Sequence, residues 1–578
     1  MSKASLIDPD RYLGTVTLVG ASAVQVNMPR ATANPERRAL SRGAVGDFVF
    51  VDCELVKLLG RIIEAKIPDA ERLAVEPSLG RVESTNPIGK IQLLASVDQR
   101  TSRLLRGLKE YPRIGDAVYL ADPLLLGQLF ANALNTTGQL TVDIGTLSAG
   151  SNVMLRLQPE RLFGRHCGIF GATGGGKSWT VASVVDQIKK VGGKAILFDP
   201  TGEFAGIPSI SKHYAFDAAE AGAEQVHFPY RKTTEDDLFA LFRPGGQSQG
   251  PKLREAIRSL KLVHALGGTS QTLTIYEQRL LTKRQRPRAA FYTAVGANAA
   301  ALHSPYCAFQ IEDLPEQISA ECIYSSDFDI PANFGKVDQQ AVGHCESLIS
   351  RIRTLVHSAE LACVFATNGP SLADIIDQFI ATDDDDIIRI SFKNVRFEHN
   401  TREILMNVIG RYLLGRARSD VFRDRPMIAV LDEAHQFLGR TIGDEYVSVK
   451  LEAFGLIAKE GRKYGLTCVL ATQRPRDVPA DVLSQLGTFI VHRLTNDEDR
   501  MAVERACGDL DRNAALFIPS LAPGEAIIIG PGLPAPVPIM IQEPTHPPNS
   551  KGPDYATFWR DRTAVKAAAN AGAALAVD

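Results

Sequence analysis

The chain has 578 residues, of which 45% are apolar and 22% are charged, and its formal net charge is −2. At about 150 residues per domain this length predicts two to four globular domains. No apolar run reaches 18 residues and the first residues lack the apolar stretch of a secretory signal, so we expect a cytoplasmic protein with no membrane partner.

Residues 1–150 contain short runs typical of β-strands, separated by glycine and proline. Strands at this spacing predict a small N-terminal β-barrel, and an irregular extension is the alternative. The predicted strands are 12–19, 47–51, 58–63 and 90–97.

Residues 151–545 read as strands alternating with helices, which predicts an α/β domain with a parallel sheet covered by helices. Residues 205–360 interrupt this rhythm and predict an inserted helical subdomain. Residues 546–578 form a C-terminal tail that begins proline-rich and ends alanine-rich. The acidic run 383–386 precedes an expected strand and is typical of a solvated turn.

The segment Gly171–Ser178 matches G-x-x-x-x-G-K-[ST] in full, with an apolar run before it and a helical pattern after it. Glycines allow backbone N–H groups to converge on phosphate oxygens, Lys177 reaches the β- and γ-phosphates, and the Ser178 hydroxyl binds Mg²⁺. The sequence therefore predicts an ATP and Mg²⁺ site. The predicted nucleotide-binding residues are Gly171, Thr173, Gly174, Gly175, Gly176, Lys177, Ser178 and Trp179.

Two acids, Asp432 and Glu433, follow the apolar run 427–431. A hydrolase needs a carboxylate for the metal and a base for the attacking water, so we predict that Asp432 holds Mg²⁺ together with Ser178 and that Glu433 polarises water. Gln473 ends a further apolar run. Its amide could sense the γ-phosphate, or it could be an ordinary hydrogen-bonding side chain at a strand end.

Four other features are less specific. The eight cysteines form no C-x-x-C pair, which predicts reduced, buried thiols and neither a zinc site nor a disulfide framework. A basic cluster within 279–288 could contact DNA phosphates, or it could be a solvated helix face or a subunit contact. The stretch 440–450 could be a loop that faces a pore. No set of acids outside the ATP site resembles a nuclease.

These motifs together resemble the HerA family of hexameric ATPases, in the HerA/FtsK branch of the RecA-like P-loop motors, of bacterial type. The resemblance covers most of residues 10–545, and the N-terminal zone looks like the small barrel of that family. Thr201 and Phe204 stand where the family often has His and Tyr. The matching segments are Arg165-His166 with 171–178, then 199–204, 431–435, 460–465 and 471–475.

The resemblance implies a homohexamer that translocates double-stranded DNA and works with a separate effector such as a nuclease. It implies that Gln473 senses the γ-phosphate and that Glu203 helps to position water or metal. Arg165 and Arg462 would reach into the neighbouring subunit's site, where an arginine finger stabilises the transferred phosphoryl group.

Two alternatives remain open. The first is an ATP-regulated hexameric scaffold that assembles and activates an antiviral effector, either a nuclease or a sirtuin-like NADase. The second is a metabolic P-loop enzyme that transfers phosphate to a small molecule, for which no acceptor motif is visible.

Overall fold

The computed structural model describes most of the chain. The described residues are 6–29, 31, 43–67, 87–98, 100–134, 139–148, 152–216, 220–366, 369–382, 387–396, 398–443, 448–508, 512–549, 554–557 and 559. The acidic run 383–386 lies outside them. Among the described residues, no helix combines the length and apolar character needed to cross a bilayer.

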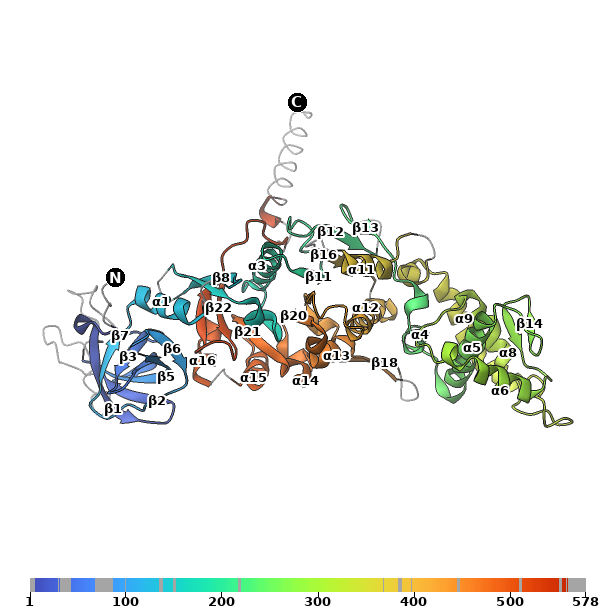
Figure 1. The fold of residues 1–578 in the computed structure, drawn as a ribbon, viewed down its shortest axis with the longest axis horizontal. Coiled ribbons are helices and arrows are strands. Elements are labelled where there is room, and N and C mark those ends of the chain that lie inside the picture. Colours follow the sequence, from blue (N-terminus) through green and yellow to red (C-terminus); the bar gives the residue numbers. More distant parts are fainter. Residues whose placement is uncertain are drawn as a thin grey trace, which may run out of the picture.

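A β-barrel occupies one end of the molecule (Figure 1). Its strands follow the order β2-β1-β7-β3-β4-β5-β6, and β2 also pairs with β5, so six of the seven strands form a closed ring. Alternate side chains such as Leu13, Val49 and Ile62 fill the interior and are fully buried. The strands are β1 (Tyr12–Val19), β2 (Ala23–Asn27), β3 (Phe48–Asp52), β4 (Lys57–Lys66), β5 (Ile88–Asp98), β6 (Arg103–Arg106) and β7 (Ala117–Leu120).

The predicted small barrel is therefore present. Its last strand ends at Leu120, before the expected boundary at residue 150, and the next strand, β8 (Val142–Leu147), belongs to the sheet of the core. The helix between them, α1 (Pro123–Leu134), packs Leu129 and Phe130 into a cluster shared by the barrel and the core.

The core is a twelve-stranded sheet in the order β13-β12-β16-β11-β17-β20-β10-β21-β22-β23-β8-β9. Pairing is parallel from β13 to β21 and antiparallel from β21 to β9. The strands are β9 (Met154–Leu157), β10 (His166–Phe170), β11 (Lys194–Asp199), β12 (Lys212–Ala215), β13 (Glu224–Gln225), β16 (Ile387–Ser391), β17 (Met427–Leu431), β20 (Leu466–Thr472), β21 (Leu486–His492), β22 (Glu525–Ile529) and β23 (Val537–Met540).

Helices cover both faces of the parallel strands, which explains why β10, β11, β16, β17, β20 and β21 are buried along their whole length. Along β11, Ala195 and Leu197 share a cluster with α3, whereas Phe198 contacts Phe454 of α13 on the opposite face. The covering helices are α2 (Pro159–Phe163), α3 (Lys177–Lys190), α11 (Leu372–Ala381), α12 (Thr401–Arg418), α13 (Ala453–Glu460), α14 (Ala480–Leu483), α15 (Asp497–Ala506) and α16 (Arg512–Ala515).

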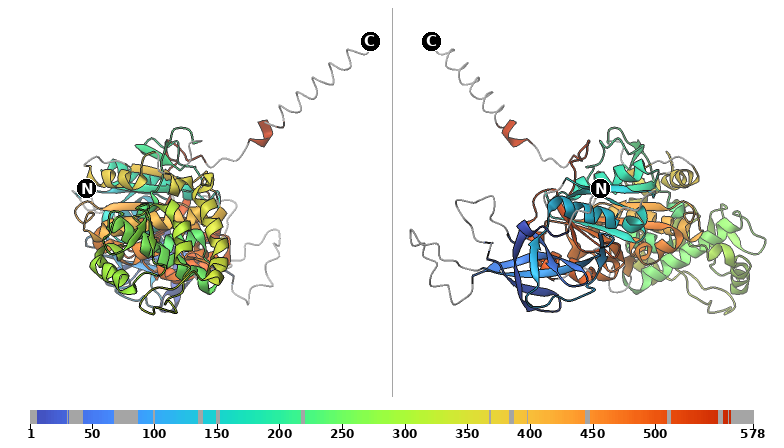
Figure 2. Two further views of the ribbon diagram at one scale, coloured as in Figure 1. Left: turned by 90° about the vertical axis from the view of Figure 1, so that its right-hand side faces the viewer. Right: turned by 60° about the vertical axis from the view of Figure 1, so that its left-hand side comes forward.

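The helical insertion forms a lobe at the end of the molecule that lies farthest from the barrel (Figure 1). Figure 2, left, looks along the long axis with this lobe in front of the core. The insertion was expected to begin near residue 205, but β12 and β13 still belong to the core sheet. The elements of the lobe and its connection are α4 (Glu235–Phe242), α5 (Gly246–Ala265), β14 (Thr274–Tyr276), β15 (Leu280–Thr282), α6 (Arg288–Ala297), α7 (Ala299–Leu302), α8 (Leu314–Glu321), α9 (Gln339–Val356) and α10 (Ala362–Phe365).

The basic cluster of the insertion is not a uniform surface patch. Lys283 is buried and its ammonium lies 2.7 Å from a carboxylate oxygen of Glu321, while Arg279 pairs with Asp313. Both cations are therefore paired with carboxylates inside the lobe, and of the two only Arg279 is exposed.

A hairpin of β18 (Arg440–Gly443) and β19 (Ser448–Leu451) occupies the stretch expected to face a pore, and residues 444–447 lie outside the described residues.

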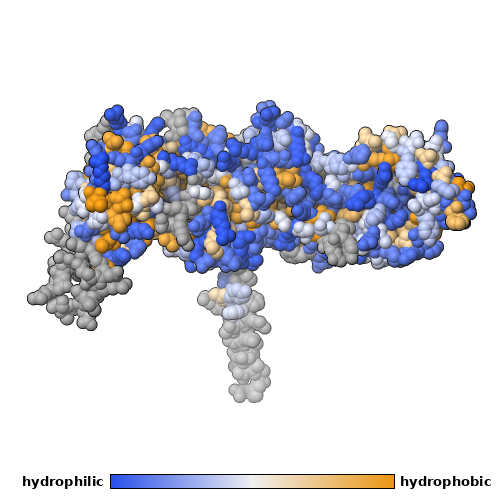
Figure 3. Space-filling view, turned by 90° about the horizontal axis from the view of Figure 1, so that it is seen from below, coloured by the Kyte–Doolittle hydropathy of each residue, from blue (hydrophilic) through white to orange (hydrophobic). Residues whose placement is uncertain are grey.

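Figure 3 shows that hydrophilic side chains cover most of the middle of one face, while apolar side chains gather toward the barrel and lobe ends. All eight cysteines are buried, as predicted.

Candidate functional site

The phosphate loop connects β10 to α3 at the carboxyl edge of the parallel sheet. Gly174 and Gly176 adopt positive φ values of 75° and 112°, which are favourable only for glycine. A Cβ atom at Gly171 would lie 2.7 Å from the Cβ of His492, so no larger residue fits there. The first N–H groups of α3 have no partner within the helix, and they form a site for phosphate oxygens.

The phosphate loop is hydrogen-bonded to the ends of the neighbouring strands β20 and β21. The Gly171 N–H donates to the Thr472 carbonyl at 3.3 Å, and the Ala172 N–H donates to the Arg493 carbonyl at 2.9 Å. The imidazole of His492 lies 2.7 Å from the Thr180 hydroxyl through Nε2. Its Nδ1 donates to the Glu525 carbonyl at 2.9 Å.

His492 is a supporting residue that sequence reasoning missed. The available signal was a histidine at the end of the apolar run Leu486–His492. Burial lowers the pKa of His492 to about 4, so the ring is neutral near pH 7. Burial also lowers the pKa of His166 to about 4, and the Nδ1 of His166 accepts from the Cys468 N–H.

Because the pKa values of His166 and His492 are lowered in the folded protein, we expect the protein to lose stability in mild acid. A pKa that is lower in the folded state than its ordinary value of about 6.5 means that the unfolded chain binds more protons below pH 6.5. Stability should therefore fall between pH 6.5 and 4, by roughly 1.4 kcal/mol per histidine for each pH unit. Thermal unfolding at pH 7.5 and 5.5 measures this, and His492→Asn should unfold earlier at pH 7.5 but show a shallower pH dependence. An equal pH dependence in both proteins would contradict the assignment.

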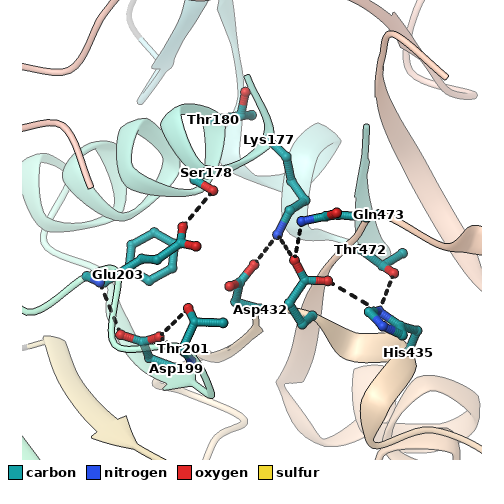
Figure 4. Close-up of polar contacts among 12 residues, drawn as sticks. Lys177, Ser178, Thr180, Asp199, Thr201, Glu203, Asp432, His435, Thr472 and Gln473 are labelled. Carbon is teal, nitrogen blue, oxygen red and sulfur yellow. Dashed lines mark hydrogen bonds and ion pairs between the residues drawn. The ribbon is translucent and has the colours of Figure 1, made fainter. Parts of the chain in front are cut away.

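Lys177 lies between the two acids that follow β17 (Figure 4). Its Nζ is 2.5 Å from Asp432 Oδ1 and 2.9 Å from Glu433 Oε1, and all three side chains are less than 10% exposed. Burial raises the pKa of Asp432 to about 6, with the charge of Glu433 acting in the same direction. Burial acts on Glu433 too, but the hydrogen bond from His435 and the charge of Lys177 outweigh it and hold the pKa of Glu433 near 2. Glu433 is therefore ionised at neutral pH, as a base must be.

Gln473 connects the phosphate loop to Glu433. Its Nε2 donates to Glu433 Oε1 at 2.9 Å, and its Oε1 accepts from the Thr173 hydroxyl at 2.7 Å. A γ-phosphate bound at the loop would lie near this amide. The geometry favours a sensing role over that of an ordinary side chain at a strand end.

His435 makes contacts that the sequence did not predict. Its Nδ1 lies 3.3 Å from Glu433 Oε2 and 2.9 Å from the Thr472 hydroxyl. Glu433 itself has a φ of 45° and a ψ of 44°, a left-handed conformation that is uncommon for a residue with a side chain. His435 and Gln473 therefore restrain the carboxylate of Glu433 from two sides (Figure 4).

Glu203 approaches from β11. The hydroxyl of Ser178 donates to Glu203 Oε2 at 3.0 Å, which places a carboxylate beside the expected metal ligand. No group of three or more His, Cys, Asp or Glu residues within the described ranges could hold a metal ion by itself. Proteins usually bind Mg²⁺ through one or two side-chain oxygens together with nucleotide phosphates, and the Ser178 hydroxyl with the Glu203 carboxylate beside it offers such oxygens. The residues present therefore fit ATP with Mg²⁺.

Arg165 and Arg462 lie at the opposite edge of the sheet. Arg165 precedes β10 and packs against Gly487. Arg462 precedes β20 and borders a cavity of about 590 Å³ with Gly192 and Gly193. The seven residues of β20 separate the two edges by roughly 20 Å, so neither guanidinium reaches the phosphate loop of its own chain. Trp179 is half-buried in the first turn of α3, and its contribution to nucleotide binding stays a prediction.

Comparisons with known proteins give a consistent result. Residues 142–297 match the family described as "Helicase HerA, central domain". The chain is 25% identical to the probable helicase MJ1565 of Methanocaldococcus jannaschii over 518 residues, which is 86% of each chain. It is also 25% identical to the DNA double-strand break repair helicase HerA of Pyrococcus furiosus, across 74% of this chain and 73% of that one.

The chain is therefore similar to the HerA family of ATPases. These similarities confirm the resemblance drawn from the motifs, and the chain is an ATP hydrolase with a P-loop core. Among solved structures, the bacterial conjugative coupling protein TrwBdeltaN70 is 13% identical with a TM-score of 0.44, across 73% of this chain and 93% of that one.

Proposed function

We propose that this HerA-family ATPase forms a homohexameric ring that hydrolyses ATP with Mg²⁺ to move double-stranded DNA and works with a separate effector protein. The observation that carries the proposal is the separation of the site residues. Lys177 and Glu433 lie at one edge of the sheet, and Arg165 and Arg462 lie at the other. A ring in which each subunit presents its arginine edge to the phosphate loop of the next would complete every site.

The residues of this chain divide the chemistry between them. Lys177 and the loop N–H groups bind phosphate oxygens, and Ser178 with Asp432 holds Mg²⁺, which when bound neutralises charge on the phosphates. Glu433 accepts a proton from the attacking water. Gln473 orients this carboxylate by its 2.9 Å hydrogen bond, and Arg462 of a neighbouring subunit stabilises the charge that develops on the γ-phosphoryl group.

DNA as the substrate is supported by the printed names of the relatives, among them the repair helicase of Pyrococcus furiosus. Within this chain, the hairpin β18–β19 is our candidate DNA contact. The hairpin carries the exposed Lys450. It follows Glu433 closely in the chain, so a displacement of Glu433 during hydrolysis would be transmitted to the hairpin through the backbone. The exposed Arg284 and Arg286 of the lobe remain further candidates.

DNA should accelerate ATP hydrolysis severalfold if the protein is a motor, and the effect should weaken as salt rises because phosphate contacts release counterions. Phosphate release with and without linear duplex DNA measures this. Lys450→Ala should lose most of the stimulation and keep the rate without DNA, whereas Lys336→Ala, an exposed lysine of the lobe, should keep both. A rate that no DNA changes at any salt concentration would contradict the motor.

An ATPase rate that does not respond to DNA would favour the alternative, a scaffold that activates an effector. The barrel supports this alternative, because none of its described residues makes a contact with Lys177, Glu433 or Gln473. A partner docked there would leave the ATP site free. An antiviral effector, either a nuclease or a sirtuin-like NADase, belongs to this alternative.

A further inference from the structure

A buried arginine lies in the middle of a core strand. Arg389 of β16 is fully buried between isoleucines, in the segment Ile387-Ile388-Arg389-Ile390-Ser391. An ionised group is costly to bury, and an apolar side chain at such a position commonly stabilises a fold as well or better. The fold alone therefore gives no reason for an arginine at this position.

Arg389 contacts two carboxylates. Its Nε donates to Asp199 Oδ2 at 2.7 Å, and its Nη2 donates to Glu220 Oε1 at 2.7 Å. The hydroxyl of Ser391 donates to the other oxygen of Glu220 at 2.5 Å. Asp199 is also fully buried. The arginine fixes the position of the Asp199 carboxylate relative to the neighbouring strand.

Asp199 in turn organises the loop that follows β11. Its Oδ1 accepts from the N–H groups of Thr201 and Gly202 at 3.2 and 2.7 Å, and its Oδ2 accepts from the Phe204 N–H at 3.1 Å. The Phe204 ring is fully buried. One carboxylate thereby holds the N–H groups of the two residues on either side of Glu203.

The backbone carbonyl of Glu203 is held as well. The Glu203 carbonyl accepts from the N–H of Asn549 at 2.8 Å. With its backbone fixed on both sides, the Glu203 carboxylate points at the Ser178 hydroxyl at 3.0 Å. Gly202, with a φ of 83°, permits the turn that this requires.

We propose that Asp199 and Arg389 are positioning residues that aim Glu203 at the Mg²⁺ side of the ATP site. Neither touches nucleotide. They act through the loop backbone, and Glu203 is the group that meets the ion or its water. The proposal rests on ATP hydrolysis with Mg²⁺ and is independent of movement along DNA.

Asp199→Asn tests this with little risk to folding, because Arg389 keeps Glu220 as a partner. The new amide nitrogen presents a donor to the Arg389 Nε and to the Phe204 N–H, so the Phe204 N–H loses its acceptor. In the opposite amide orientation, the Thr201 and Gly202 N–H groups lose theirs. Arg389→Lys keeps the positive charge but cannot bridge both carboxylates with one planar group. The matched control is Asp237→Asn, another buried aspartate that accepts from backbone and from Arg411, far along the chain from the ATP site.

The readout is binding of a fluorescent ATP analogue with Mg²⁺ and with EDTA, together with the Mg²⁺ dependence of hydrolysis. For both variants we expect Mg²⁺-dependent binding and half-saturation by Mg²⁺ to weaken by about 10- to 100-fold, as for other groups that orient a metal ligand. Binding in EDTA should stay at the wild-type level, and Asp237→Asn should resemble wild type in every assay.

A double variant separates positioning from general structure. Because Asp199 acts through Glu203, Asp199→Asn should add nothing to the defect of Glu203→Gln. Full additivity, or an equal loss of binding in EDTA, would overturn the proposal. A wild-type protein that binds the analogue equally with and without Mg²⁺ would instead contradict the Mg²⁺-dependent site on which the proposal rests.

Discussion

Glu433→Gln should lower the rate of ATP hydrolysis by about 10²- to 10⁴-fold while leaving ATP binding nearly unchanged. Glutamine keeps the shape and can still hydrogen-bond Gln473, but it cannot accept a proton from water. It also removes one of the two negative charges beside Lys177, which favours the lysine's interaction with phosphate. Steady-state phosphate release and binding of a fluorescent ATP analogue measure the two effects.

The matched control for this change is Glu346→Gln, an exposed glutamate on α9 in the helical lobe. It should hydrolyse ATP at the wild-type rate. If Glu433→Gln retains more than about a tenth of the wild-type rate, the base lies elsewhere, since general-base catalysis typically contributes at least 10²-fold. Glu203 would then be the next carboxylate to test.

Arg462→Ala should cost roughly 10³-fold or more in turnover, because the finger stabilises charge that appears only in the transition state. The arginine serves the neighbouring subunit's site, so the variant's own Lys177 and Glu433 remain intact. Co-expression of Arg462→Ala with Glu433→Gln, under two affinity tags purified in series, gives mixed assemblies that test this.

In such an assembly, a site that takes Glu433 from one variant and Arg462 from the other has both groups. Hydrolysis should therefore reappear well above that of either variant alone. A mixed assembly as inactive as its parents would contradict a shared site. Arg165→Ala can be compared in the same way, and a smaller loss there would make Arg462 the principal finger.

The parts of the site that follow from local chemistry were readable in the sequence. The phosphate loop needs glycines, a lysine and a hydroxyl in fixed order, and the acids after β17 must end a buried strand. Parallel strands present their carboxyl ends at one edge, and the structure brings these residues and Gln473 within hydrogen-bond distance there.

The residues that support this site were not readable, because their partners lie on strands far apart in the chain. His492 supports the phosphate loop from a strand that follows it by more than 300 residues, and Arg389 reaches Asp199 across 190 residues. The position of each in an apolar run was visible, but its partner was not. Lys283 is a further example. In the sequence it is one residue of a basic cluster, but in the structure it is buried and paired with Glu321.

Domain boundaries were also beyond the sequence pattern. Strands β8 and β12 are short segments that could have ended the barrel or begun the insertion. Pairing alone, with β23 for β8 and with β16 for β12, assigns them to the core sheet. This long-range pairing depends on which strand lies at the edge of the sheet, and the local β-propensity of a segment does not determine its pairing partner.

The most direct test of a DNA-translocating ring is displacement of a third strand from a DNA triplex. A motor moving along the duplex must strip the third strand, at a rate set by ATP and abolished by Glu433→Gln. We predict ATP-dependent displacement from a triplex placed on a linear duplex, with no displacement when ATP is replaced by a non-hydrolysable analogue. A protein that hydrolyses ATP at full rate on this substrate and leaves the third strand bound would contradict the account.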